Sequence, residues 1–378
     1  MTLSTNAVTP RARVLAALAH EMPDRVPMDL GSTPDSTIIL PGYERLKRHL
    51  GVAAAPTRIV NRMMQAVEVD EPVLRELEID MRGVYPSAPA PLVLDENRYR
   101  DEWGVERVRP AGALYYDQVS YPLSAEISER DIVQYPWPDP DDPVRTRGVR
   151  ETVRRIRQDT EYAVVLNLPS AFVHTSQYLR GFEEWYIDLA SDRRLLGCLF
   201  DAVMEVNLGI CRNLLKAAGD GVDVVFTADD LGFQGGLMMD PDGYREIIKP
   251  RHRRYLQAIH ELTPAKILFH TCGSVVDIMD DLIEVGVDIL NPVQVSAAGM
   301  DAATLKKTWG DRLCFWGGID TQHLLPSGSV EDVRAGVERQ IAILGRDGGY
   351  VLGAVHNIQP DVPPENVVAM FRHARDCG

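Results

Sequence analysis

This chain of 378 residues has few cysteines and lacks the short motifs that bind nucleotides. Its five cysteines stand at irregular spacing, which argues against the disulfide framework of a small secreted domain. The dinucleotide fingerprint G-x-G-x-x-G and the phosphate loop G-x-x-x-x-G-K-[ST] are both missing. These absences exclude a disulfide-stapled scaffold and the common nucleotide-binding enzymes.

The sequence also lacks a long apolar run and an excess of positive charge. No stretch approaches the roughly 18 apolar residues of a membrane-spanning helix. The 40 basic residues are outnumbered by 55 acidic ones, and the net charge of −15 argues against nucleic acids and acidic membrane surfaces as partners. The first 20 residues are amphipathic and no small-residue cleavage site follows them, so we expect a cytoplasmic protein.

Apolar, strand-like runs alternate with amphipathic helical patterns along most of the chain. The strand candidates are 26–30, 80–84, 162–166, 223–228, 266–270, 287–291, 312–317 and 349–354. The helical patterns cover 193–218, 242–262, 275–284, 302–308 and 330–344. About eight β-then-α units favour a closed (β/α)8 TIM barrel over an open doubly wound sheet. Residues 85–145, rich in proline and acidic residues, predict an irregular insertion with short strands in a single domain, 1–378.

Polar residues follow one predicted strand after another, where the active site of such a barrel lies. Loops are polar in any case, so the accumulation carries more weight than any single residue. We expect Asn167, Gln234, Asn291 and Gln294 to shape a substrate pocket. Asp229 and Asp230 are adjacent carboxylates that repel each other unless a cation or hydrogen-bond donor compensates them. They are candidate catalytic groups or a fourth metal ligand; an N-cap for the loop that follows them is the alternative.

His270 and Cys272 end the apolar run 266–270 with one residue between them. On extended backbone their side chains share a face, and imidazole with thiolate suits zinc. A buried structural pair is the competing interpretation. His356, after the last predicted strand, supplies a third ligand, and three protein ligands with an open position are typical of a catalytic zinc site.

Several segments resemble the uroporphyrinogen decarboxylase superfamily, and within it the branch of zinc-dependent, corrinoid-linked methyltransferases. The matching segments are Asp24-Arg-Val-Pro27, Asp229-Asp-Leu-Gly-Phe-Gln234, His270-Thr-Cys-Gly-Ser274, Gly317-Gly-Ile-Asp320, Gly348-Gly-Tyr-Val-Leu352 and Asp361-Val-Pro-Pro-Glu-Asn366. The resemblance implies a TIM barrel with its active site at the carboxyl ends of the strands. The decarboxylase itself has an arginine-rich N-terminal loop, whereas residues 26–44 here contain no arginine or lysine. Asp80 is the one candidate for that enzyme's pyrrole-binding aspartate.

The methyltransferase branch binds zinc through a His-x-Cys pair and a late cysteine, and His356 stands at that cysteine's place. The departure implies either loss of the metal or ligation by His270, Cys272 and His356. One thiolate leaves Zn²⁺ with a formal positive charge, which favours polarising an oxygen over activating a thiol. This points to the demethylase half-reaction, with methyl ethers as donors.

The corrinoid-binding pattern D-x-H-x-x-G is absent, so a corrinoid must be carried by a separate protein. We therefore expect a zinc-dependent methyltransferase that moves a methyl group from a small methylated substrate to a corrinoid (cobalamin) protein. One alternative is a decarboxylase-like lyase without metal; another is a non-catalytic scaffold that binds a metal or a corrinoid partner. A homo-oligomer is compatible with the sequence.

Overall fold

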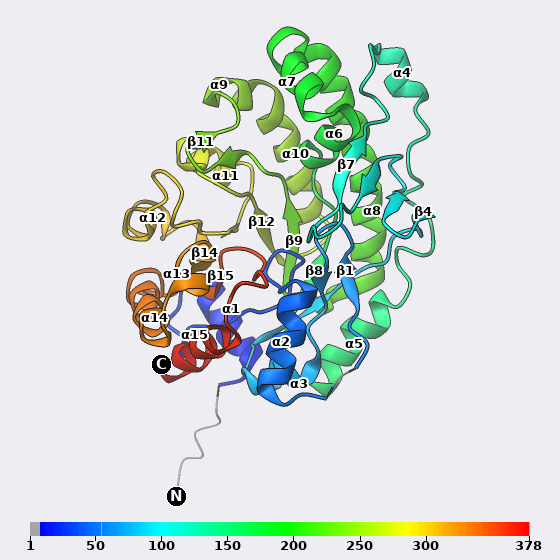
Figure 1. Cartoon of the computed structure of the whole chain (residues 1–378). Helices are drawn as coiled ribbons and strands as arrows, with labels where there is room; N and C mark the ends of the chain where they lie inside the picture. The colour runs from blue at the N-terminus through cyan, green and yellow to red at the C-terminus, as the bar shows by residue number, and fades with distance from the viewer. Residues whose placement is uncertain (1–7, 54, 378) are drawn as a thin grey trace, which may run out of the picture.

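The computed structural model describes residues 8–53 and 55–377. Seven parallel strands form a curved central sheet in the order β15-β14-β13-β12-β9-β8-β3, surrounded by helices (Figure 1). Their bounds are β3 (Met81–Val84), β8 (Ala163–Asn167), β9 (Val224–Ala228), β12 (Lys266–His270), β13 (Ile289–Asn291), β14 (Cys314–Ile319) and β15 (Tyr350–Ala354).

Segment 26–30 occupies the gap between the two edges of this sheet. Met28 forms a parallel bridge with Leu352 of β15, and the Asp29 amide donates to the Leu352 carbonyl at 2.9 Å. On the other side, the Asp80 amide donates to the Met28 carbonyl at 3.1 Å. The segment therefore closes the sheet, and the predicted (β/α)8 barrel is confirmed.

The barrel strands are continuous apolar segments because both faces of the sheet are covered by other parts of the protein. Every residue of β8, β9 and β15 is buried. One face packs inside the barrel and the other against helices, as in parallel sheets generally. Val14 and Leu18 of α1 (Pro10–Leu18) pack with Trp316 and Val351 in the interior cluster, so α1 covers the amino end of the barrel.

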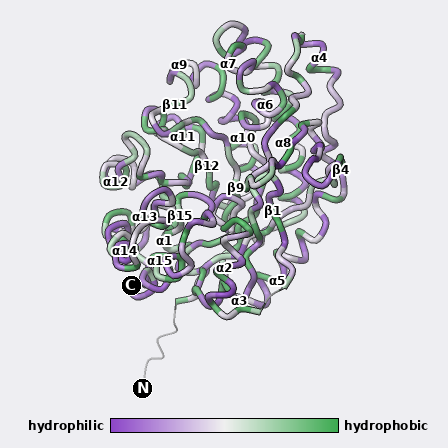
Figure 2. The backbone as a smooth tube through the Cα atoms, in the orientation of Figure 1, coloured by the Kyte–Doolittle hydropathy of each residue, from purple (hydrophilic) through white to green (hydrophobic). Residues whose placement is uncertain are grey.

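Most helices are amphipathic, and along the tube in Figure 2 hydrophilic and hydrophobic residues alternate through them. Two begin and end at the predicted residues, α8 (Arg193–Ala218) and α14 (Val330–Leu344). The others are α2 (Leu40–Leu50), α3 (Glu71–Glu76), α4 (Glu129–Gln134), α5 (Val149–Asp159), α6 (Val173–Arg180), α7 (Phe182–Ser191), α9 (Pro241–Gly243), α10 (Lys249–His260), α11 (Met279–Glu284), α12 (Ala302–Trp309), α13 (Leu324–Ser327) and α15 (Pro364–Asp376). None of the helices among the described residues has both the length and the apolar character needed to span a bilayer.

The helix predicted over 242–262 differs from a single regular α-helix. A π-helical turn, Tyr244–Ile248, separates α9 from α10. Pro250 lies in the first turn of α10, and proline has no amide hydrogen to donate to the preceding turn. Because this hydrogen bond is missing, the backbone before Pro250 forms the wider π-helical turn.

Residues 85–145 contain a second, antiparallel sheet at the right of Figure 1. Its strands pair in chain order: β4 (Leu92–Asp95), β5 (Arg98–Arg100), β6 (Glu106–Val108) and β7 (Asp117–Ser120). The remaining strands form two short antiparallel pairs. One pair is β1 (Ile59–Asn61) with β2 (Ala66–Val67), and the other is β10 (Gly232–Phe233) with β11 (Gly236–Leu237).

Candidate metal centre and active site

The three predicted metal ligands lie together at the carboxyl ends of the barrel strands. His270 is the last residue of β12, Cys272 comes two residues later, and His356 comes two residues after β15. One ligand atom from each lies within 4.8 Å of the others. His270 Nε2 is 3.3 Å from Cys272 Sγ, and the two imidazole centroids are 5.5 Å apart. This donor set suits a borderline-soft divalent ion such as zinc.

Asn291 orients the His270 ring. Asn291 ends β13, the strand beside β12, and its Oδ1 lies 2.7 Å from His270 Nδ1. An amide oxygen accepts only, so Nδ1 must donate the proton and Nε2 is left free toward Cys272. Metal-binding histidines are commonly held in this way through their second nitrogen. Asn291 therefore lies behind a candidate ligand, and its predicted contact with substrate remains a prediction.

The backbone after Cys272 turns sharply and packs against β10. Gly273 has a φ of +81°, and a Cβ there would lie 2.4 Å from the Phe233 amide nitrogen. Its amide donates to Gln294 Oε1 at 2.7 Å, and Gln294 Nε2 donates to Gln234 Oε1 at 2.8 Å. The two glutamines thus fix the loop that carries Cys272, and their predicted substrate contacts remain predictions.

The adjacent aspartates have different surroundings. Asp229 is fully buried, and its two oxygens accept from the amides of Phe172 and His174 at 3.0 and 3.1 Å. His252 Nε2 lies 3.1 Å from the same carboxylate. Asp229 therefore holds the start of α6 in place, whereas the alternative left open by the sequence was a cap for the loop that follows Asp230.

Asp230 faces the candidate ligands. Its Oδ1 accepts from the Cys272 amide at 2.7 Å and lies 4.0 Å from His270 Nε2. Its Oδ2 lies 3.0 Å from Nε2 of His174. Burial opposes charge on His174, but Asp230 outweighs it and raises the pKa of His174 to about 9. An imidazolium–carboxylate pair therefore stands beside Cys272 at neutral pH.

Asp35 is a second carboxylate at the centre and was not among the site residues predicted from the sequence. Its Oδ2 lies 3.8 Å from His270 Nδ1, and its Oδ1 lies 3.9 Å from His356 Nε2. Asn357 donates to the neighbouring Pro34 carbonyl at 2.6 Å and so anchors this loop. The place of Asp35 in the chain could have identified it as a site residue. It follows the first barrel strand, just as Asp229 and His270 lie at the ends of later strands.

The carboxylates make the centre complementary to a cation. Burial, together with Asp230 and Asp35, raises the pKa of the Cys272 thiol, so the thiolate needs a positive charge next to it. Burial also lowers the pKa of His356, which favours the neutral ring that binds metals. Two imidazoles, one thiol and two nearby carboxylates fit a divalent metal by geometry and by charge.

The remaining predicted pocket residue, Asn167, lies apart from the candidate ligands at the end of β8. Its Nδ2 donates to the carbonyls of Ser32 and Val84 at 3.0 and 3.1 Å. Its Oδ1 is buried with no partner among the described residues. Asn167 thus joins two neighbouring barrel segments, and a contact with substrate remains a prediction.

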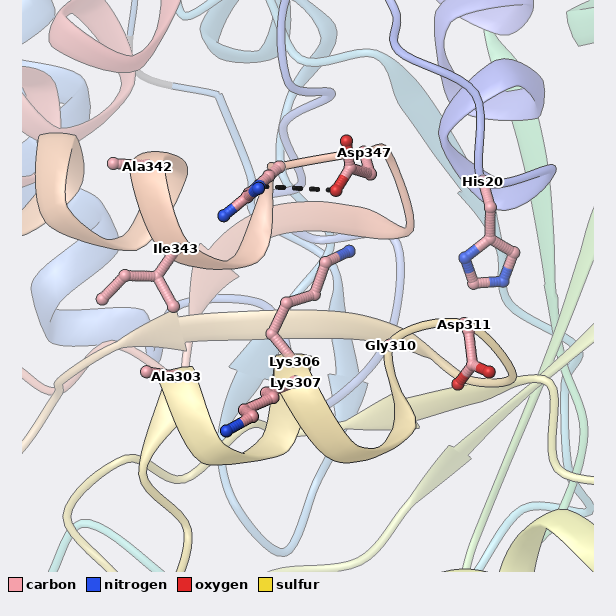
Figure 3. A pocket seen from close by; sticks show the side chains of 10 residues that line it. His20, Ala303, Lys306, Lys307, Gly310, Asp311, Ala342, Ile343 and Asp347 are labelled. Atoms are coloured by element: carbon pink, nitrogen blue, oxygen red, sulfur yellow. Dashed lines mark ion pairs between the residues drawn. The ribbon is translucent and has the colours of Figure 1, made fainter.

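A cavity of about 710 Å³ lies at the opposite end of the barrel (Figure 3). It is lined by Gly310 and Asp311, shortly before β14, and by Arg346 and Asp347, shortly before β15. Active sites of TIM barrels lie at the carboxyl ends of the strands. This cavity contains none of the predicted site residues and is not the candidate active site.

Comparison with known proteins places the chain in a family. The sequence pattern described as "Uroporphyrinogen decarboxylase (URO-D)" matches residues 115–377. The chain is 31% identical to the methylcobamide:CoM methyltransferase MtaA of Methanosarcina barkeri over 198 residues, which is 52% of each protein. It is 21% identical to the uroporphyrinogen decarboxylase of Trichodesmium erythraeum over 71% of this chain and 78% of that protein.

A solved structure agrees with the fold. The structure of a methyltransferase from Methanosarcina mazei superimposes with a TM-score of 0.68 and 21% identity, over 97% of this chain and 98% of that one. The predicted superfamily, and the resemblance to its methyltransferase branch, are confirmed. The chain spans about half the length of the M. barkeri relative that it matches. With the pattern covering most of the sequence, this chain belongs to the uroporphyrinogen decarboxylase family.

Proposed function

We propose that this protein is a zinc-dependent methyltransferase that moves a methyl group from a small methylated substrate to a corrinoid on a separate protein. The observation that carries the proposal is the convergence of His270, Cys272 and His356 within 4.8 Å at the carboxyl end of the barrel. Similarity to a methylcobamide:CoM methyltransferase supports methyl transfer and a corrinoid as the second reactant.

The proposed ligands are His270 Nε2, Cys272 Sγ and His356. Bound there, zinc would act as a Lewis acid toward the heteroatom that carries the methyl group. With one thiolate among its ligands, the centre favours oxygen over sulfur, so methyl ethers are the proposed donors. Asn291 fixes the orientation of the His270 ring, because its Oδ1 accepts a hydrogen bond from His270 Nδ1 at 2.7 Å.

In this proposal His174 and Asp230 supply the proton that the oxygen of the donor needs once the methyl group has left. A corrinoid on the partner protein would accept the methyl group as a formal cation with its own electron pair, so the ether oxygen would keep a negative charge. His174, held protonated by Asp230 at 3.0 Å, is placed to return a proton from Nε2 to that oxygen. Asp229 positions His174 by accepting from its backbone amide.

The test combines metal analysis with a transfer assay. Protein purified without chelator should contain one zinc per chain at this centre, and His270→Ala and Cys272→Ser should each lose it. Incubation with a Co(I) corrinoid protein and a panel of methoxylated compounds should give methylcobalamin absorbance with wild-type protein only. Absence of stoichiometric zinc, or transfer that survives the loss of zinc, would contradict the proposal.

A decarboxylase-like lyase is the second candidate, because decarboxylases of this family match up to 71% of the chain. Asp80 does not support it. Asp80 directly precedes β3 at the amino end of the barrel, where it is fully buried and paired with Arg13 and Arg25. Release of carbon dioxide from a porphyrinogen, unchanged by chelation, would favour this candidate.

A further inference from the structure

Outside the candidate active site, the last two long helices of the chain bring a second group of metal-binding side chains together. Glu338 lies in the middle of α14, His373 lies in the last turn of α15, and Cys377 directly follows α15. One ligand atom from each of the three residues lies within 4.8 Å of the others. Helices α14 and α15 pack against each other next to the C-terminus (Figure 1). The three side chains therefore come from two elements that are already in contact.

His373 and Cys377 face the same direction. They are four residues apart, and residues at this spacing lie on one face of a helix. The Cys377 amide donates to the His373 carbonyl at 3.1 Å, so the helical hydrogen-bond pattern continues to Cys377. Two ligands four residues apart on a helix are a known way to bind zinc. The end of α15 thus presents an imidazole and a thiol to the same ion.

Glu338 supplies a carboxylate from the neighbouring helix. Its Oε1 lies 2.8 Å from Nε2 of His373. In the parts of the chain that the structure describes, no lysine or arginine lies within ion-pair distance of Glu338. The two arginines of α15 pair instead with acidic residues at the end of α3: Arg372 with Glu76 and Arg375 with Glu78. Compensation of the Glu338 charge is therefore left to His373, which is positive only when protonated.

The chemistry of this donor set suits a borderline-soft divalent ion such as zinc, because it combines one nitrogen, one sulfur and one carboxylate oxygen. Zinc binds such atoms at about 2.0–2.3 Å, so two ligands of a tetrahedral ion lie roughly 3.5 Å apart. Small side-chain rotations reach this separation, because the side chains of Glu338 and His373 are 62% and 21% exposed and are not fixed by dense packing. Solvent at this surface can supply water as the fourth ligand.

We propose that Glu338, His373 and Cys377 bind a second zinc ion, which links the end of α15 to α14. This α14–α15 site belongs to two outer helices, whereas the candidate active site lies at the carboxyl ends of the strands. An ion that binds only the folded chain stabilises it, so the α14–α15 site is structural in its effect. The inference goes beyond the proposed function and does not depend on methyl transfer.

Cobalt absorption distinguishes the two centres, because a thiolate-to-cobalt band requires a bound cysteine. Metal-free full chain with Cys272→Ser has lost the thiolate of the candidate active site, yet on titration with Co²⁺ it should still develop this band. Addition of Cys377→Ser to that variant should abolish the band. Addition of Cys198→Ser instead is the matched control, because Cys198 is also half-buried but belongs to neither group of ligands, and the band should persist.

Zinc stoichiometry provides a second measurement in which the candidate active site is unaltered. Equilibrium dialysis of metal-free protein against zinc should give two ions per chain for wild-type protein and one for His373→Ala. Glu338→Gln should weaken the α14–α15 site by roughly 100-fold or more, because loss of a ligand should exceed the 10- to 100-fold cost of losing a group that only orients one. Glu331→Gln is its control, because Glu331 is also on α14 but pairs with Arg334, and affinity should be unchanged.

Absence of the cobalt band in Cys272→Ser, or a band that survives the addition of Cys377→Ser, would overturn the inference. The two proposals fail separately. If wild-type protein binds one zinc that is lost in His270→Ala and kept in His373→Ala, the α14–α15 site falls and the proposed metal centre stands. If the one zinc is instead kept in His270→Ala and lost in His373→Ala, the α14–α15 site stands and the proposed function falls.

Discussion

His270 Nδ1 lies 2.7 Å from Asn291 Oδ1, and this contact leaves His270 Nε2 facing Cys272 Sγ at 3.3 Å. The two residues end neighbouring strands and are paired in register. Strand pairing therefore places a hydrogen-bond acceptor behind a candidate metal ligand, and the tautomer follows from the chemistry of the amide oxygen.

Replacement of Asn291 should weaken zinc binding without removing a ligand. In Asn291→Ala the ring loses its acceptor, and affinity should fall by about 10- to 100-fold, as is usual for groups that orient metal ligands. Competition with a chromogenic chelator measures it. Asn167→Ala is the matched control, because Asn167 ends β8 and contacts none of the three candidate ligands. Equal zinc affinity in Asn291→Ala and wild-type protein would show that the contact does not orient His270.

Replacement of His356 by cysteine should change the character of the metal centre. His356→Cys adds a second thiolate, so bound zinc should remain but be less electrophilic, and ether demethylation should slow. With Co²⁺ in place of zinc, the thiolate-to-metal absorption should increase relative to wild-type protein. An unchanged spectrum would show that residue 356 is not a ligand.

The His174–Asp230 pair predicts a pH dependence of stability. The pKa of His174 in the folded protein, about 9, lies above its ordinary 6.5. The stabilisation linked to protonation of His174 is therefore fully present below about pH 6.5, down to the strongly acidic range in which Asp230 takes up a proton, and is lost as the pH rises through about 9. NMR titration of His174 should show the raised pKa in wild-type protein and a lower one in Asp230→Asn.

The control for that experiment is a histidine–aspartate pair whose histidine is exposed. His323, with 76% of its side chain exposed, lies 3.1 Å from Asp320. Asp320→Asn should change the free energy of unfolding little, because solvent screens the exposed His323 side chain. Equal slopes of stability against pH in Asp230→Asn and wild-type protein would contradict the prediction.

Asp80 should be a major determinant of stability. It is buried, pairs with Arg13 and Arg25 at 2.6 and 2.8 Å, and accepts from the Met28 amide at 2.8 Å. Asp80→Ala removes the carboxylate that pairs with Arg25 and leaves Arg13 with Asp24 alone, where segment 26–30 closes the barrel, and should lower the free energy of unfolding by about 3–5 kcal/mol. Denaturant titration measures the loss.

Asp24→Ala is the comparison for Asp80. Asp24 also pairs with Arg13, at 2.6 Å, but 41% of its side chain is exposed. Its loss should cost about 1 kcal/mol or less. Similar losses for the two variants would mean that Asp80 does not hold the closure of the barrel.

Several features of the fold and the site were predictable because they depend on local pattern. Alternating apolar strands and amphipathic helices predicted the barrel, since each element must bury one face or both. The spacing of His270 and Cys272 on extended backbone predicted a shared direction for their side chains. The position of His356 after the last strand predicted that it would lie near His270 and Cys272, because all parallel strands of a barrel end at one face.

The roles of several residues were not predictable, because they depend on contacts between distant segments. Asp35 reaches His270 and His356 only through the conformation of the loop after segment 26–30. Asp229 and Asp230 are neighbours in sequence, yet one accepts from the start of α6 and the other from the Cys272 amide. Successive side chains on extended backbone point in opposite directions, but the residues packed around each carboxylate decide which groups it contacts.

By itself the sequence determined the barrel and the gathering of His270, Cys272 and His356, since periodicity and strand order are properties of the chain. Only the tertiary structure decided that Asn291 lies behind His270 and that Asp230 pairs with His174. These contacts join loops and elements far apart in the chain. No local pattern encodes them, because packing sets the distances between such segments.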